Sequence, residues 1–167
     1  MKLFVTVGST GFDELIDAAT APGFLSHIVS LGYTSLLIQY GSSKDIFLRN
    51  TKDYNGDGLD IQGYDYKATI EQDVKHADWI VSHSGAGTIL QALRLHKKVI
   101  VIVNESLLDN HQAELAQAMA MKKYVLYSDI SHLSEALSMA PTKHLEAFPE
   151  PNRRLFASIL DKQMGFP

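Results

Sequence analysis

Seven consecutive residues, Ser82-His83-Ser84-Gly85-Ala86-Gly87-Thr88, have the types and spacing of a phosphate-binding turn. They follow a short apolar run and precede a stretch with helical spacing, so they should connect a strand to a helix. Bare backbone N–H groups at a helix start, with the positive end of the helix dipole, suit a phosphate or diphosphate. The same residue types equally fit a purely structural turn in which Ser84 is the N-cap.

The common phosphate and nucleophile motifs do not fit this segment. A dinucleotide fingerprint needs a third glycine where this chain has Leu90, and a Walker A loop needs a Gly-Lys-Ser/Thr sequence that the chain lacks. A hydrolase elbow needs a glycine two residues before its serine, but Ser82 stands two residues before Ser84. None of these motifs therefore identifies the ligand.

A second polar segment, Asp109-Asn110-His111-Gln112, begins the next predicted helix. Asp109 and Gln112 have capping-box spacing, which is a sufficient structural reason for both. Asn110 and His111 have no such explanation and should lie in the first turn of a helix at the binding edge of a sheet. Two helix N-termini at one crevice, one for phosphate and one with amides for sugar hydroxyls, describe a nucleotide-sugar site.

Metal ligation is weakly supported. Among the 7 histidines, only His83 and His111 lie at candidate ligand loops. Asp53–Gly58 matches the opening of an EF-hand calcium loop, but the twelfth position of that loop is Tyr64 instead of glutamate. Asn104-Glu105-Ser106 is a formal glycosylation sequon that should stay unmodified, because we see no secretory signal. We therefore expect no metal and no cofactor.

Composition narrows the class of protein. The 167 residues are 46% hydrophobic and 20% charged, which is typical of a soluble globular domain with a real core. The net charge of -4 without a basic block argues against nucleic-acid binding and against a basic membrane patch. Without cysteine there is no disulfide, thiolate nucleophile or Cys-based zinc site. The longest aliphatic run, Val99–Val103, is too short to span a bilayer, which takes about 20 residues.

Strand and helix patterns alternate along the chain. This alternation predicts an α/β fold of Rossmann type, a mostly parallel sheet with helices on both faces, in one domain over residues 1–167. In such sheets ligands bind beyond the carboxyl ends of the strands, here at 8–11, 82–88 and 104–112. We expect strands at 3–7, 35–40, 59–64, 79–82, 99–103 and 124–127. We expect helices near 12–19, 24–31, 69–77, 88–95, 110–121, 130–139 and 152–164, and a loop at 50–59.

The sequence resembles a known family at three places. Val5-Thr6-Val7-Gly8-Ser9-Thr10 followed by Phe12-Asp13-Glu14-Leu15-Ile16 is similar to the start of the soluble subunit of the eukaryotic UDP-N-acetylglucosamine transferase. That enzyme adds the second sugar of the dolichol-linked oligosaccharide. Residues 82–88 and 103–112 are similar to its two signature blocks. The family is related to the bacterial transferase that acts on a lipid-linked peptidoglycan precursor, and this chain resembles only the C-terminal, donor-binding half of that GT-B enzyme.

The resemblance implies roles for individual residues. Related enzymes often carry an acidic residue that holds the ribose where this chain has Gln91, and an amide binds a hydroxyl less strongly than a carboxylate does. The cleft should be lined by Gly8, Ser9 and Thr10. The UDP phosphates should contact Ser84, Gly85, Ala86, Gly87 and Thr88. The sugar or its flanking phosphate should contact Asn110, His111 and Gln112, with Glu105 nearby.

The resemblance also implies a partner and a place. A membrane-anchored subunit should supply the acceptor-side domain, the acceptor should be a sugar on a polyprenyl diphosphate, and the chain should be cytoplasmic and recruited to the cytosolic face of the endoplasmic reticulum. The expected reaction is inverting transfer of N-acetylglucosamine, with helix dipoles and backbone N–H groups stabilising the departing UDP. We expect the general base on the partner or at the interface, with His83 as a helper on this chain.

Two other functions fit the sequence. One is a split transferase of another UDP-sugar, as in bacterial surface-polysaccharide synthesis. The other is a nucleotide-sugar-binding or scaffold protein without catalysis. We expect the apolar face from Leu155 to Met164 to pack on the domain itself. The alternative is that this face binds the partner.

Overall fold

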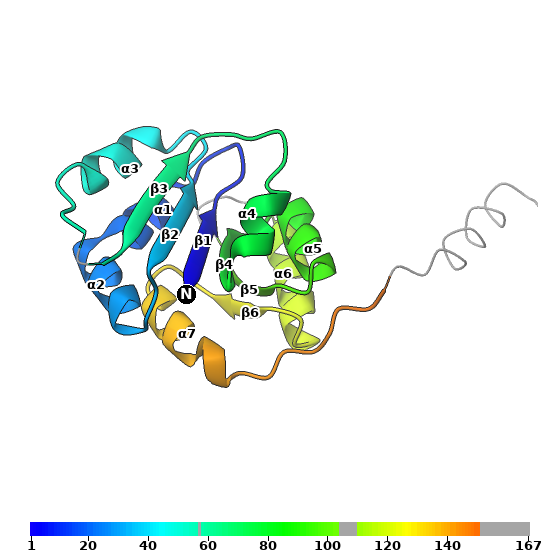
Figure 1. Ribbon diagram of the computed structural model, residues 1–167. Coiled ribbons are helices and arrows are strands. Elements are labelled where there is room, and N and C mark those ends of the chain that lie inside the picture. The colour runs from blue at the N-terminus through cyan, green and yellow to red at the C-terminus, as the bar shows by residue number, and fades with distance from the viewer. Residues whose placement is uncertain (57, 104–109, 151–167) are drawn as a thin grey trace, which may run out of the picture.

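The computed structural model describes residues 1–56, 58–103 and 110–150, and for residues 110–113 the backbone alone. Within these ranges the strands form one sheet in which every neighbouring pair is parallel (Figure 1). The sheet order is β3-β2-β1-β4-β5-β6. The strands are β1 (Lys2–Thr6), β2 (Ser35–Gln39), β3 (Asp60–Tyr64), β4 (Trp79–His83), β5 (Lys98–Ile102) and β6 (Leu126–Ser128).

Helices follow the strands and cover parts of both faces of the sheet. The described helices are α1 (Asp13–Thr20), α2 (Pro22–Ser30), α3 (Lys44–Thr51), α4 (Glu71–His76), α5 (Ala86–Arg94), α6 (Asn110–Met121) and α7 (Leu133–Met139), with a short 3-10 helix at Ala140–Thr142. Figure 1 shows α4, α5 and α6 together on one side of the sheet.

The core has two layers, one on each face of the sheet. Alternate residues of β1 point to opposite faces, as the period of a strand requires: Leu3 and Val5 join one layer and Phe4 joins the other. The first layer is closed by apolar residues of α1, α2 and α7, and the second by residues of α4 and α5. Near-continuous apolar strands such as β5, which is buried from Val99 to Ile102, are typical of a parallel sheet covered on both faces.

The strand order reverses between β1 and β4. The chain builds outward from β1 to β2 and β3, then crosses back to β4 and builds in the other direction. Consequently the loops that leave β1 and β4 diverge to opposite faces, and between such loops, at the carboxyl edge, doubly wound sheets bind their ligands in a crevice. The register pairs Thr6 with Ser82, so both loops start side by side.

Most predicted elements are confirmed, and the differences are local. Helix α3 was not predicted, because its sequence Lys-Asp-Ile-Phe-Leu-Arg-Asn-Thr is polar and buries only Phe47; it also takes Asn50 and Thr51 from the predicted loop. Helix α5 begins at Ala86, two residues before the predicted start at Thr88. The predicted helix at 152–164 lies outside the described residues.

The loop after β1 is locked to the loop after β2. Ser43 Oγ accepts a hydrogen bond from the Phe12 N–H at 3.0 Å, and Ser42 Oγ donates to the Thr10 carbonyl. Gly41, in the loop after β2, has φ +55° and lies against the loop after β1. A Cβ on Gly41 would lie 2.9 Å from both Gly11 N and Gly8 O. The position therefore excludes a side chain by conformation and by space.

We predict that Gly41→Ala lowers the free energy of unfolding by more than about 2 kcal/mol, because it adds backbone strain to a collision with two fixed backbone atoms. Gly23→Ala is the matched control, since Gly23 lies in α2 and a Cβ there meets nothing within 4 Å. The control should be neutral or stabilising by up to about 1 kcal/mol. Urea denaturation of both variants checks this, and equal effects would contradict it.

Candidate functional site

The turn from β4 into α5 connects a buried strand end to a helix whose N-cap is a glycine. Ser82 is fully buried and donates its Oγ hydrogen bond to the His83 carbonyl at 2.8 Å. Ser84 is also buried, and the N-cap is Gly85 rather than Ser84, with extended backbone at φ -67° and ψ 117°. Because the N-cap is a glycine, the N-cap residue itself offers no side-chain acceptor to the first backbone N–H groups of α5.

The imidazole of His83 lies between two glycines from different loops. A Cβ on Gly8 would lie 2.9 Å from His83 Cε1, and a Cβ on Gly85 would lie 2.8 Å from the same atom and closer still to Nε2. His83 Nδ1 is 3.4 Å from the Thr6 carbonyl oxygen, a long hydrogen bond back to the end of β1. One side chain therefore contacts the β1 end, the β1–α1 loop and the start of α5.

Burial lowers the pKa of His83 below its ordinary value, and the hydrogen bond to the Thr6 carbonyl offsets this effect only in part. The ring is therefore neutral near pH 7. A carbonyl oxygen can only accept, so Nδ1 carries the proton and Nε2 keeps its lone pair.

The β1–α1 loop brings the other predicted cleft residues beside this turn. The Gly8 N–H donates to Thr6 Oγ1 at 3.2 Å, while Ser9 and Thr10 are exposed. Thr6 Oγ1 in turn donates to Gln39 Oε1 at 2.6 Å in a buried contact. Sequence reasoning missed this Thr6–Gln39 pair, and its only signal is a polar residue near the end of each of two apolar strands.

Gly87 differs from the other glycines of the turn. It lies in the first turn of α5 without a positive φ, and a Cβ on it would meet nothing within 4 Å. Packing within the described chain therefore gives no reason for glycine at this position, although glycine weakens a helix by about 1 kcal/mol relative to alanine. Gln91, four residues later, lies on the same face of the helix, with Thr88 beside it.

The remaining predicted residues are placed only in part. The backbone of Asn110, His111 and Gln112 forms the first turn of α6, which begins where predicted and follows β5 at the same edge of the sheet. Their side chains, and Glu105 entirely, lie outside the described residues. The chain thus brings residues 8–10 and 82–88 together, with α6 beginning beyond the neighbouring strand.

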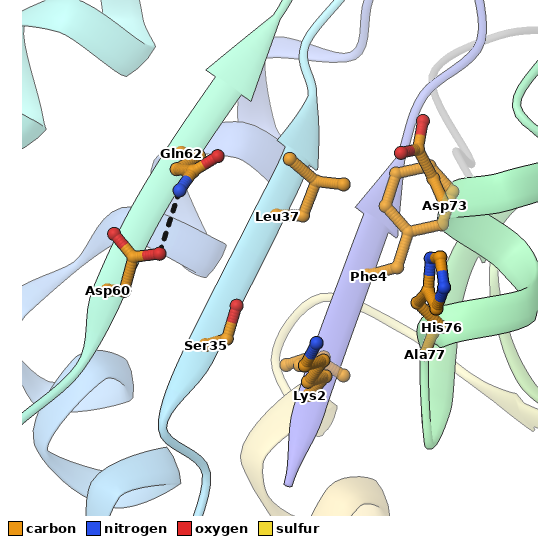
Figure 2. Close-up of a pocket in the computed structure, with 10 residues that line it drawn as sticks. Lys2, Phe4, Ser35, Leu37, Asp60, Gln62, Asp73, His76 and Ala77 are labelled. Carbon is orange, nitrogen blue, oxygen red and sulfur yellow. Dashed lines mark hydrogen bonds between the residues drawn. The ribbon is translucent and has the colours of Figure 1, made fainter.

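A hollow of about 300 Å³ lies elsewhere, on the sheet face beside α4 (Figure 2). Its rim includes Lys2, Ser35 and Asp60, which are the first residues of their strands. Its charged groups already have partners in part: Asp73 accepts from Lys67 Nζ and Tyr64, and Asp60 accepts from Gln62 at 2.8 Å. It begins at the amino ends of the strands, so we assign the site to the crevice at the opposite edge.

Within residues 1–56, 58–103 and 114–150, no group of three or more histidine or acidic side chains could hold a metal ion. Tyr64, the twelfth position of the calcium-like pattern, lies in β3 and donates its hydroxyl to Asp73 at 2.7 Å. Among the described helices, none combines the length and the apolar character needed to cross a membrane.

A model of the glycosyltransferase family 28 C-terminal domain matches residues 2–163. The chain belongs to this family. The match agrees with the fold and with the resemblance noted in the sequence, and it covers nearly the whole chain.

Relatives carry the same name in distant eukaryotes. The chain is 30% identical over 171 residues to "UDP-N-acetylglucosamine transferase subunit ALG13" of Yarrowia lipolytica, covering 99% of this chain and 86% of that protein. It is 37% identical over 125 residues to the human protein of that name, covering 75% of this chain. The chain spans 11% of the length of the human and mouse relatives.

Two solved structures are similar in fold. A solution NMR structure of ALG13 matches with a TM-score of 0.71 and 27% identity, covering 96% of this chain and 94% of that one. A crystal structure of Acinetobacter baumannii MurG matches with a TM-score of 0.58 and 16% identity, covering 98% of this chain and 42% of that one. The Rossmann-type fold is therefore confirmed.

We predict opposite effects on stability for the two glycines of the turn. Gly85→Ala should lower the free energy of unfolding by at least about 2 kcal/mol, because its Cβ collides with the His83 ring. Gly87→Ala should leave it unchanged or raise it by up to about 1 kcal/mol, because the site is open and alanine favours the helix. Urea denaturation measures both, and a destabilised Gly87→Ala variant would contradict the assignment of an open face.

Proposed function

We propose that this chain binds UDP-N-acetylglucosamine and is the donor-binding subunit of a two-subunit transferase. The reaction is inverting transfer of N-acetylglucosamine to N-acetylglucosamine on a dolichyl diphosphate. Support comes from the family, from relatives named as transferase subunits, and from the reversal of the strand order between β1 and β4, beside which the two candidate loops begin.

The observation that carries the proposal is the open N-terminal turn of α5. Gly87 leaves the approach to the backbone clear, and the first turn, whose N-cap is a glycine, offers its N–H groups and dipole to a diphosphate. We assign the phosphates to Ser84, Gly85, Ala86, Gly87 and Thr88, and the ribose to Gln91, which lies one turn further along the face of Gly87. Gly8, Ser9 and Thr10 would line the other side of the crevice.

The chemistry required of this chain is stabilisation of the departing UDP. Preorganised backbone donors and a helix dipole do this without reorganising as charge develops on the leaving diphosphate, and they need no metal ion. Asn110, His111 and Gln112, with Glu105, would bind the sugar or its flanking phosphate, since α6 begins beside the crevice. The site thus divides into a phosphate helix and a sugar helix.

The second half of the active site would come from a membrane-anchored partner that supplies the acceptor domain and the general base. The acceptor would be a sugar on a lipid diphosphate, and the complex would work at the cytosolic face of the endoplasmic reticulum, where the partner would recruit this chain. Relatives named as subunits support a partner.

One alternative is a split transferase of a different UDP-sugar. Gln91 does not separate the two, because every UDP-sugar presents the same ribose to it; its amide binds a ribose hydroxyl less strongly than a carboxylate does, which bears on the affinity for the nucleotide. This alternative keeps the two-subunit design and changes both the donor and the acceptor, as in bacterial surface-polysaccharide synthesis. A panel of donors separates the two readings.

The test is transfer of labelled N-acetylglucosamine from UDP to a lipid-diphosphate-N-acetylglucosamine acceptor, with the chain alone and with a co-expressed candidate membrane subunit. We expect product only when both subunits are present, and we expect EDTA not to abolish it. UDP-N-acetylglucosamine should be preferred over UDP-glucose and UDP-galactose as the donor. Full turnover by the chain alone would contradict the split site. Complex formation without product from any UDP-sugar would support a non-catalytic binding protein.

Gly87→Ala is the informative variant in this assay, because its fold should be intact. A methyl group on the open face should raise the donor KM about tenfold, equivalent to about 1.4 kcal/mol. Gly23→Ala in α2 is the control and should transfer at the wild-type rate.

A further inference from the structure

The role of His83 follows from where its ring lies. The ring occupies the space between Gly8, in the loop after β1, and Gly85, at the start of α5. Either glycine would collide with the ring if it carried a Cβ, at 2.9 Å and 2.8 Å from Cε1 respectively. Both loops therefore approach the same imidazole closely.

The ring of His83 is also hydrogen-bonded to the end of β1. Its Nδ1 donates to the carbonyl of Thr6, and the hydroxyl of Thr6 accepts from the Gly8 N–H at 3.2 Å while donating to the buried Gln39. This chain of contacts runs from β2 through the end of β1 to His83. It fixes the ring relative to the sheet rather than to either loop alone.

We propose that His83 is a positioning residue whose ring sets the separation between the β1–α1 loop and the first turn of α5. The role rests on the proposed donor site, and it differs from the catalytic helper expected from the sequence. The single proton of the neutral ring is used on Thr6, so Nε2 has no hydrogen to donate to a phosphate oxygen. Nε2 is also the ring atom nearest to the Cβ position of Gly85, so its lone pair faces the backbone of the turn.

The first test uses the wild-type chain and the long-range ¹H–¹⁵N spectrum of its histidines at pH 7, with and without saturating UDP. We expect His83 to show a protonated Nδ1 and an unprotonated Nε2 in both states. A protonated Nε2 in the UDP-bound state would overturn the proposal, because the ring would then be a direct phosphate ligand.

The second test uses His83→Ala, with His76→Ala as the matched control at an exposed position of α4. In the free protein, amide exchange at residues 8–12 should be at least about tenfold faster in His83→Ala and unchanged in the control. The dissociation constant for UDP, measured by calorimetry, should rise about tenfold. With the membrane subunit, the donor KM should rise while kcat stays within about threefold.

Unchanged exchange at residues 8–12 together with unchanged UDP affinity would overturn the positioning role. Should His83→Ala fail to fold, His83→Asn gives the same readouts, because its amide keeps a donor for the Thr6 carbonyl while vacating the space between the glycines. A wild-type chain that does not bind UDP would refute the proposed function, while the exchange measurement in the free protein would still decide the role of His83.

Discussion

The parallel pairing of β1 with β4 is the constraint on which the rest of the site depends. It places Thr6 beside Ser82 and sends the two following loops to opposite faces of the sheet from adjacent starting points. The residues assigned to the diphosphate all lie on one of these loops or on the first turn of α5. A slip of one residue in this register would turn buried strand residues to the other face and separate His83 from Gly8.

Two different reasons explain why glycine occupies positions near this edge of the sheet. Gly41 and Gly85 are required by the protein itself, the first by backbone atoms of the neighbouring loop and the second by the His83 ring. Gly87 is required by nothing in the described chain, and a bound diphosphate would supply the missing reason. Separating glycines that serve packing from glycines that serve a ligand is a stronger argument for a binding site than the count of glycines in a motif.

Most strands could be predicted because their signals are local: short apolar runs, two of which, 3–7 and 35–40, are followed directly by a glycine. Helix α3 could not, because it is polar and contributes one buried ring, Phe47, through tertiary packing that no periodicity reports. The alternative of a purely structural turn made Ser84 the N-cap of α5, the usual residue type, but Ser84 is buried and the N-cap is Gly85. The contact of His83 with Gly8 joins residues 75 positions apart and has no sequence signal.

The central claim is that a diphosphate binds between the loop after β1 and the start of α5. The most direct test is titration of the ¹⁵N-labelled chain with UDP, followed through its backbone amides, with uridine as the control that lacks phosphate. The account predicts that UDP produces its largest shift changes at residues 8–11 and 84–88, and that uridine leaves these amides nearly unchanged. Shift changes confined to the hollow around Lys2, Ser35 and Asp60, with none at these two loops, would contradict it.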